Sequence, residues 1–190
     1  PFITPTPLHD DPDPKPTPVR GFDAVAEAVL GEGGDEVGGV LGEAVARVHA
    51  AVREGRIDVA GELAEEVVAD GTQRLAPDHP DLLQARELSA YIAYLGGEPV
   101  HAVRISLDLA RIHHHAGDPE AAYGNIQSAA TAWRAVRDPH QGLELGTDLL
   151  TLWTELATGD GPAADDQAPL EKARARMLRL AERAQAQTQS

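Results

Sequence analysis

Leu75-Ala76-Pro77-Asp78-His79-Pro80-Asp81 opens a stretch in which two helix-length segments are separated by nearly identical turns. The first segment ends at Gly97-Glu98-Pro99-Val100-His101-Ala102, and the second ends at Gly117-Asp118-Pro119-Glu120-Ala121-Ala122. Gly55-Arg56-Ile57-Asp58-Val59-Ala60 is a third, upstream copy of the same turn. This recurrence predicts an all-α chain built from repeated helix pairs.

Outward from this stretch, apolar residues at helical spacing predict six helices in three pairs. The expected spans are about residues 40–54, 58–75, 81–95, 99–115, 119–136 and 141–157. Pro99 and Pro119 fit helix starts, because the N–H that proline lacks has no helical partner in the first turn. We therefore expect one helical repeat domain over residues 40–158.

The flanking segments differ from the repeat in composition. Residues 1–21 are rich in proline, which predicts an extended, polyproline-like tether. Residues 22–39 predict a short helix and a glycine-rich joint, which lacks the Lys-Ser/Thr ending of a phosphate-binding loop. Residues 159–169 predict a linker, and residues 170–188 an amphipathic helix. We expect the helices beginning at Phe22 and Leu170 to cap the two ends of the repeat, with the C-terminal helix also a candidate to block a groove.

Composition narrows the classes of function. The 190 residues, 42% of them hydrophobic, suffice for one domain with a core. A net charge of −15 disfavours nucleic acid as a partner, because binding the phosphate backbone needs clustered cations. No apolar run reaches the roughly 18–20 residues of a membrane span, and no signal-peptide pattern is present, so we expect a cytoplasmic protein with no membrane partner.

The absence of cysteine excludes disulfides, thiolate metal sites and a cysteine nucleophile. Lysine occurs only at Lys15 and Lys172 while arginine is common, a bias that indicates a high-GC genome. The chain begins at Pro1, which we expect to mark a fragment or a processed product of a longer protein.

The turn glycines Gly55 and Gly97 lie 42 residues apart, and a further 42 residues leads to Pro139, the next helix break. A fixed period of one helix pair is typical of a solenoid.

Over about residues 40–157 the pattern resembles the tetratricopeptide repeat, in the 42-residue form of kinesin-light-chain-like repeats. Residues 75–82 resemble the linker between repeats of that form. The small residues at which that family packs its helices closely are matched by Val48, Ala60, Ala90, Ala102 and Ala132. Glu144 departs from this pattern in the third pair.

The resemblance implies that the first helix of each pair lines a concave groove that binds a peptide or a partner helix. At the central groove position the period places His49, Tyr91 and Trp133. The predicted partner-binding residues are these three and others about one turn away from them on the same helices. The full set is His49, Arg53, Glu87, Tyr91, Tyr94, Trp133 and Arg137. Aromatic and arginine side chains carry most of the binding energy at interfaces, and two arginines would suit an acidic or carboxylate-bearing peptide.

Two observations weigh against that assignment. Tyrosine and tryptophan at helical spacing also fill cores, in which case Trp133 would lie between the fifth and sixth helices beside Trp153. The asparagine pair with which the long-repeat family grips peptides is absent, since Glu87-Leu88 stands there.

His113-His114-His115 is the one candidate for metal or catalytic chemistry. Consecutive helical residues point about 100° apart, so the three imidazoles cannot converge on one ion. The residues four positions earlier, Leu109, Ala110 and Arg111, are not ligands of divalent metals. We expect His114 to pack in the buried stripe of its helix, with His113 and His115 beside it. No catalytic constellation appears, so we expect neither an enzyme nor a bound metal or cofactor.

The sequence therefore predicts a TPR-like helix-hairpin solenoid of about three pairs with a capping C-terminal helix. The expected function is a non-catalytic protein–protein interaction module. The resemblance implies a regulatory part of a larger bacterial signalling protein, such as a Ser/Thr kinase or a transcriptional regulator. Two alternatives stand beside it. One is a structural domain that self-associates as a homodimer, and the other is an enzyme or metal-sensing domain centred on residues 113–115.

Overall fold

The computed structural model describes residues 21–31 and 38–189, and every regular element in these ranges is an α-helix. Residues 1–20 of the predicted tether and residues 32–37 of the predicted glycine-rich joint lie outside the described residues. The helices are α1 (Asp23–Leu30), α2 (Gly42–Arg53), α3 (Ile57–Arg74), α4 (Pro80–Leu95), α5 (Pro99–His115), α6 (Pro119–Ala135), α7 (Pro139–Thr158), α8 (Pro162–Asp165) and α9 (Ala168–Thr188). The all-α prediction is confirmed, and none of these helices is long and apolar enough to cross a membrane.

The six predicted helices appear as α2 to α7, with ends within about two residues of those expected. The repeated turn explains this agreement. Gly55, Gly97 and Gly117 adopt φ of 73°, 79° and 75°, a left-handed conformation that glycine reaches without steric cost. The amide of the residue after each glycine donates a 2.9 Å hydrogen bond to a carbonyl in the last turn of the preceding helix. Each turn therefore ends one helix in the same way.

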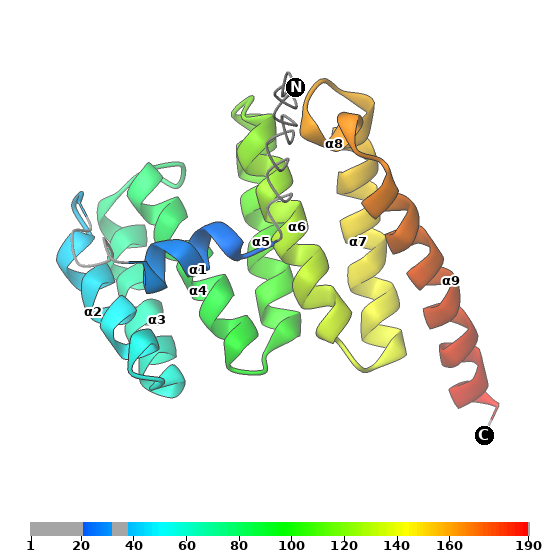
Figure 1. The fold of residues 1–190 in the computed structure, drawn as a ribbon, viewed down its shortest axis with the longest axis horizontal. Coiled ribbons are helices and arrows are strands. Elements are labelled where there is room, and N and C mark those ends of the chain that lie inside the picture. Colours follow the sequence, from blue (N-terminus) through cyan, green and yellow to red (C-terminus); the bar gives the residue numbers. More distant parts are fainter. Residues whose placement is uncertain (1–20, 32–37, 190) are drawn as a thin grey trace, which may run out of the picture.

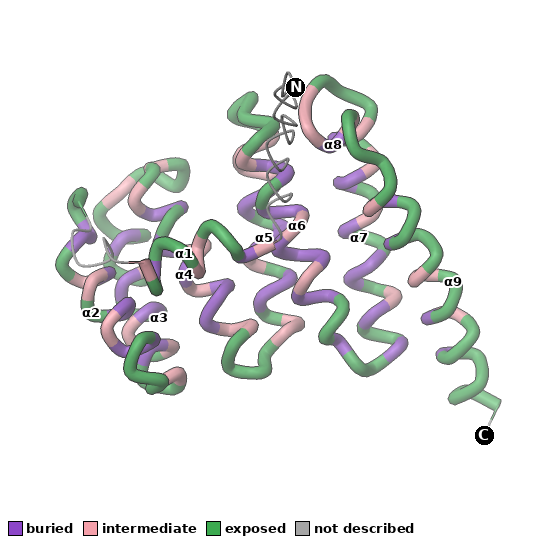
Figure 2. Tube along the Cα trace, viewed as in Figure 1, coloured by how far each residue is buried: buried purple, intermediate pink, exposed green. Residues whose placement is uncertain are grey.

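Helices adjacent in sequence pack against one another from α2 to α7, and α9 continues the row along α7 (Figure 1). This arrangement is compatible with a helical-repeat solenoid. Buried residues recur along the helices of the row, between exposed ones (Figure 2). The small residues Val48, Ala60, Ala90 and Ala102 are all at most 1% exposed, as expected where helices approach closely.

The C-terminal helix α9 packs at the end of the row. Leu170 and Leu180 of α9 are fully buried, and α9 packs along α7, so it covers the C-terminal end of the row. The predicted linker over residues 159–169 contains the short helix α8, which contacts α6 and α7.

Helix α1 does not cap the N-terminal end of the row, so that expectation is wrong. It lies across the face formed by α2, α4 and α6, the first helices of the three pairs (Figure 1). The reason is that α1 has two buried apolar side chains, Phe22 just before its start and Val29 near its end, which need apolar neighbours. We refer to this surface as the α2–α4–α6 face.

Candidate functional site

Phe22 holds the start of α1 on the α2–α4–α6 face. Its ring stacks on Tyr94, with centroids 5.3 Å apart and planes inclined by 19°, and tilts against Tyr91 at 5.8 Å. Such aromatic pairs contribute about 0.5–1.5 kcal/mol each beyond the burial of their area. Tyr91 and Tyr94 both belong to α4, so they form a single platform for an aromatic residue that arrives from elsewhere.

The backbone before α1 contacts α6 directly. The amide of Phe22 donates a 3.1 Å hydrogen bond to Ser128 Oγ, whose hydroxyl donates in turn to the carbonyl of Gly124 at 3.2 Å. At Gly21 the chain comes so close to α6 that an added Cβ would lie 2.1 Å from the carbonyl oxygen of Gln127. Only glycine fits in this position.

Phe22 is held in a strained conformation. Its φ is 68°, and it is the one non-glycine residue with a positive φ among residues 21–31 and 38–189. A left-handed conformation costs an L-residue roughly 1–2 kcal/mol. The stacking and the amide hydrogen bond offset this cost, so the position of Phe22 depends on the contacts that it makes with α4 and α6.

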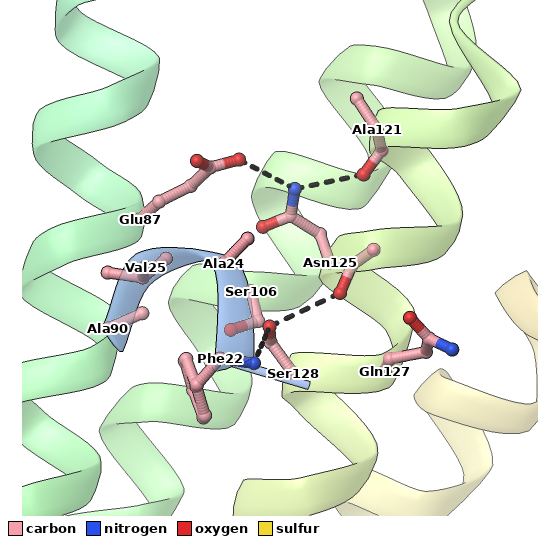
Figure 3. A pocket seen from close by; sticks show the side chains of 11 residues that line it. Phe22, Ala24, Val25, Glu87, Ala90, Ser106, Ala121, Asn125, Gln127 and Ser128 are labelled. Carbon is pink, nitrogen blue, oxygen red and sulfur yellow. Dashed lines mark hydrogen bonds between the residues drawn. The ribbon is translucent and has the colours of Figure 1, made fainter. Parts of the chain in front are cut away.

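Beside α1 lies a cavity of about 190 Å³ with a polar edge (Figure 3). Asn125 Nδ2 donates to Glu87 Oε1 and to the carbonyl of Ala121, both at 3.0 Å. His113 Nε2 lies 3.8 Å from the same carboxylate oxygen, beyond hydrogen-bond distance. Ser106 Oγ is fully buried at the base of the cavity and makes no hydrogen bond. The cavity therefore places one carboxylate and several polar atoms next to α1.

On its other side α1 borders a shallower groove between α4 and α6. The groove is lined by Tyr94 and Leu95 from α4, by Thr131 and Arg134 from α6, and by residues of α1. Leu95 is one of the few large apolar side chains that are exposed. The α2–α4–α6 face thus continues as an open surface beyond the area that α1 covers.

Three of the predicted partner-binding residues meet at α1. Tyr91 and Tyr94 contact Phe22, and Glu87 lines the cavity beside α1. His49 is buried on α2, Arg53 is exposed in the last turn of α2, and Arg137 is exposed between α6 and α7.

Trp133 is 1% exposed and lies in the contact of α6 with α7 and α9. Its Nε1 donates to the carbonyl of Gly142 at 2.7 Å, and the guanidinium of Arg176 lies 4.9 Å from the ring centroid. Trp153 pairs instead with Tyr123 at 6.4 Å. The structure therefore places Trp133 in the core, away from the surface that α1 covers.

The residues of the site that sequence reasoning missed are Gly21, Phe22, Asn125 and Ser128. One signal was present. The segment 22–30 is apolar on one side, too short for a stable isolated helix and followed by a glycine-rich run, so it has to pack on another surface. Nothing in the sequence indicates which surface that is.

The three consecutive histidines have three different environments. His113 faces Glu87 on α4, while His114 Nε2 lies 3.1 Å from Glu155 Oε1 on α7. His115 Nδ1 is 2.7 Å from the carbonyl of Arg111.

The side chain of His113 is 15% exposed and that of His114 is 34% exposed, so His113 is the more buried, contrary to expectation. The reason is that α5 packs between α4 and α7, so that His113 faces α4 and His114 faces α7. In the described ranges, no group of three His, Cys, Asp or Glu side chains is placed to hold a metal ion.

Comparison of the chain with known protein families, with curated proteins and with solved structures finds no match.

Proposed function

We propose that this protein is a non-catalytic interaction module whose α2–α4–α6 face binds a short helix of a partner protein. The observation that carries the proposal is the stacking of Phe22 on Tyr94 and Tyr91. Here a short helix with an aromatic residue at its start already lies on the face, in the manner of a bound ligand. A helix packed by its apolar side on a complementary surface is a recurring mode of peptide recognition.

The balance of forces on α1 supports its replacement by a partner. An eight-residue helix is not stable by itself in water, so α1 is ordered only while it is docked. Ordering each residue costs about 1–2 kcal/mol, and the strain at Phe22 adds to that cost. Burial of Phe22 and Val29 opposes this cost. The net free energy of docking is therefore smaller than the gain from burial alone, and a better-fitting helix can exceed it.

The wider proposal follows the resemblance of the sequence. The 42-residue spacing of Gly55, Gly97 and Pro139, with the same left-handed glycine turn inside the first two helix pairs, supports a tetratricopeptide-like repeat. In such a protein the module would serve as a regulatory part of a larger bacterial signalling protein, acting in the cytoplasm. Helix α1 would then keep the face covered until the partner is present, because an attached segment competes at a high effective concentration.

The test uses the full chain and a fluorescent peptide of residues 21–31. Gly21→Ala places a Cβ against the backbone of α6, so this variant should leave the face uncovered. Gly38→Ala is the matched control, because its Cβ meets nothing within 4 Å. We expect the peptide to bind the Gly21→Ala chain, and to bind the wild type and the control at least about tenfold more weakly.

A second variant tests the location of binding. Adding Tyr94→Ala to the Gly21→Ala chain removes half of the aromatic platform and should abolish peptide binding, while the circular dichroism spectrum stays helical. A Gly21→Ala chain that is folded but binds no peptide at millimolar concentration would overturn the proposal.

A further inference from the structure

We propose that the partner helix carries a basic residue two positions after its aromatic anchor, and that this residue pairs with Glu87. The inference rests on the proposed function and specifies the chemistry of the partner. It concerns the position that Ala24 occupies in α1.

Glu87 has no strong cationic partner among the described residues. Its side chain is 29% exposed, and it receives a hydrogen bond from the uncharged amide of Asn125. In the same ranges, no arginine or lysine forms an ion pair with Glu87, and the neighbouring Arg86 faces Asp108 on α5 at 3.8 Å. His113 Nε2, the nearest imidazole nitrogen, is itself buried without a hydrogen-bond partner. A half-buried carboxylate without an arginine or lysine partner is stabilised more by an added cation than an exposed carboxylate is.

The cavity has room for that cation. Ala24 lines it together with Glu87 and Asn125, and the Ala24 side chain points toward these two residues (Figure 3). Ala24 is exposed, so a longer side chain at this position does not meet the core. The cavity has a volume of about 190 Å³ and borders both Ala24 and Glu87, so the stem of a lysine at position 24 would extend into the space beside the carboxylate.

Helix α1 itself has no basic residue beside Glu87. It has alanine and valine beside the cavity, and its only charged residues, Asp23 and Glu27, are acidic. The whole chain has a net charge of −15, which attracts basic segments and repels acidic ones. The charge of α1 therefore does not complement that of Glu87. A helix with a basic residue at this position is the better ligand.

The experiment compares three peptides of residues 21–31 on the full-length Gly21→Ala chain. They are the native peptide, an Ala24→Lys peptide and a Leu30→Lys peptide, which carries the same charge at a side chain that is 58% exposed on another side of the helix. We expect the Ala24→Lys peptide to bind about three- to tenfold more tightly than the native peptide, and the Leu30→Lys peptide to gain less.

Glu87→Gln in the same chain removes the charge but keeps an oxygen that accepts from Asn125. It should cancel the advantage of the Ala24→Lys peptide, whereas Glu182→Gln on α9 should preserve it. A gain that is equal for both lysine peptides, or that persists in Glu87→Gln, would overturn this inference and leave the proposed function standing. If none of the three peptides binds, the proposed function itself fails.

Discussion

At the scale of single residues, Phe22 decides where the N-terminal segment lies. Its ring contacts α4 and its amide contacts α6. Both contacts are made while its backbone has the unfavourable left-handed conformation. The position of α1 therefore depends strongly on one side chain, which a single substitution can test.

Phe22→Ala should release α1 without unfolding the helices from α2 to α9. The variant loses both ring contacts with α4 and the burial of the aromatic side chain, and the truncation of a buried phenylalanine typically costs about 3–5 kcal/mol. We expect a protease specific for glutamate to cleave after Glu27 much faster than in the wild type. Leu30→Ala is the control, because Leu30 is 58% exposed on the same helix. Equal cleavage rates in the three proteins would contradict the role of Phe22.

At the scale of helices, local chemistry determines most of the boundaries. The turns at Gly55, Gly97 and Gly117 need a left-handed glycine, and the prolines at positions 99 and 119 mark helix starts, so these limits could be predicted from the sequence. Placing α1 required long-range information, because the partners of Phe22 lie about seventy to one hundred residues further along the chain. Periodicity likewise selects Trp133 and Tyr91 equally, although Trp133 packs against α7 and α9 and Tyr91 contacts Phe22 at the start of α1.

The contact among α6, α7 and α9 tolerates no larger residue at Gly146. An added Cβ would lie 2.6 Å from Cζ2 of Trp133, whose ring is fixed by its hydrogen bond to Gly142, and it would also meet Met177. Gly146→Ala should therefore destabilise the protein by about 1–3 kcal/mol in urea unfolding. Gly124→Ala on α6, where a Cβ meets nothing within 4 Å, should instead be neutral or stabilising by about 0.5–1 kcal/mol. Equal effects of the two substitutions would show that Gly146 is not packed in this way.

At the scale of the whole molecule, two buried tyrosines link stability to alkaline pH. Burial raises the pKa of Tyr91 above its ordinary value of 10.0, and burial with the nearby Asp166 carboxylate raises the pKa of Tyr123. The folded state favours the protonated form of these phenols. The stability that they contribute is therefore fully present below pH 10 and is lost as the pH rises through their raised pKa values. The free energy of unfolding should thus decline above about pH 10, and less steeply in a Tyr91→Phe/Tyr123→Phe chain. An identical decline in both chains would show that other groups are responsible.

On the proposed function, α1 is a replaceable occupant of the α2–α4–α6 face. Hydrogen exchange of the amides in residues 23–30 tests this most directly, since a helix of this length is protected only while it is docked. In the free protein we predict measurable protection of α1. When the Ala24→Lys peptide is added at saturating concentration, this protection should disappear while that of α2 to α7 is unchanged. Peptide binding that leaves the protection of α1 intact would contradict the replacement of α1, because the peptide would then occupy another surface.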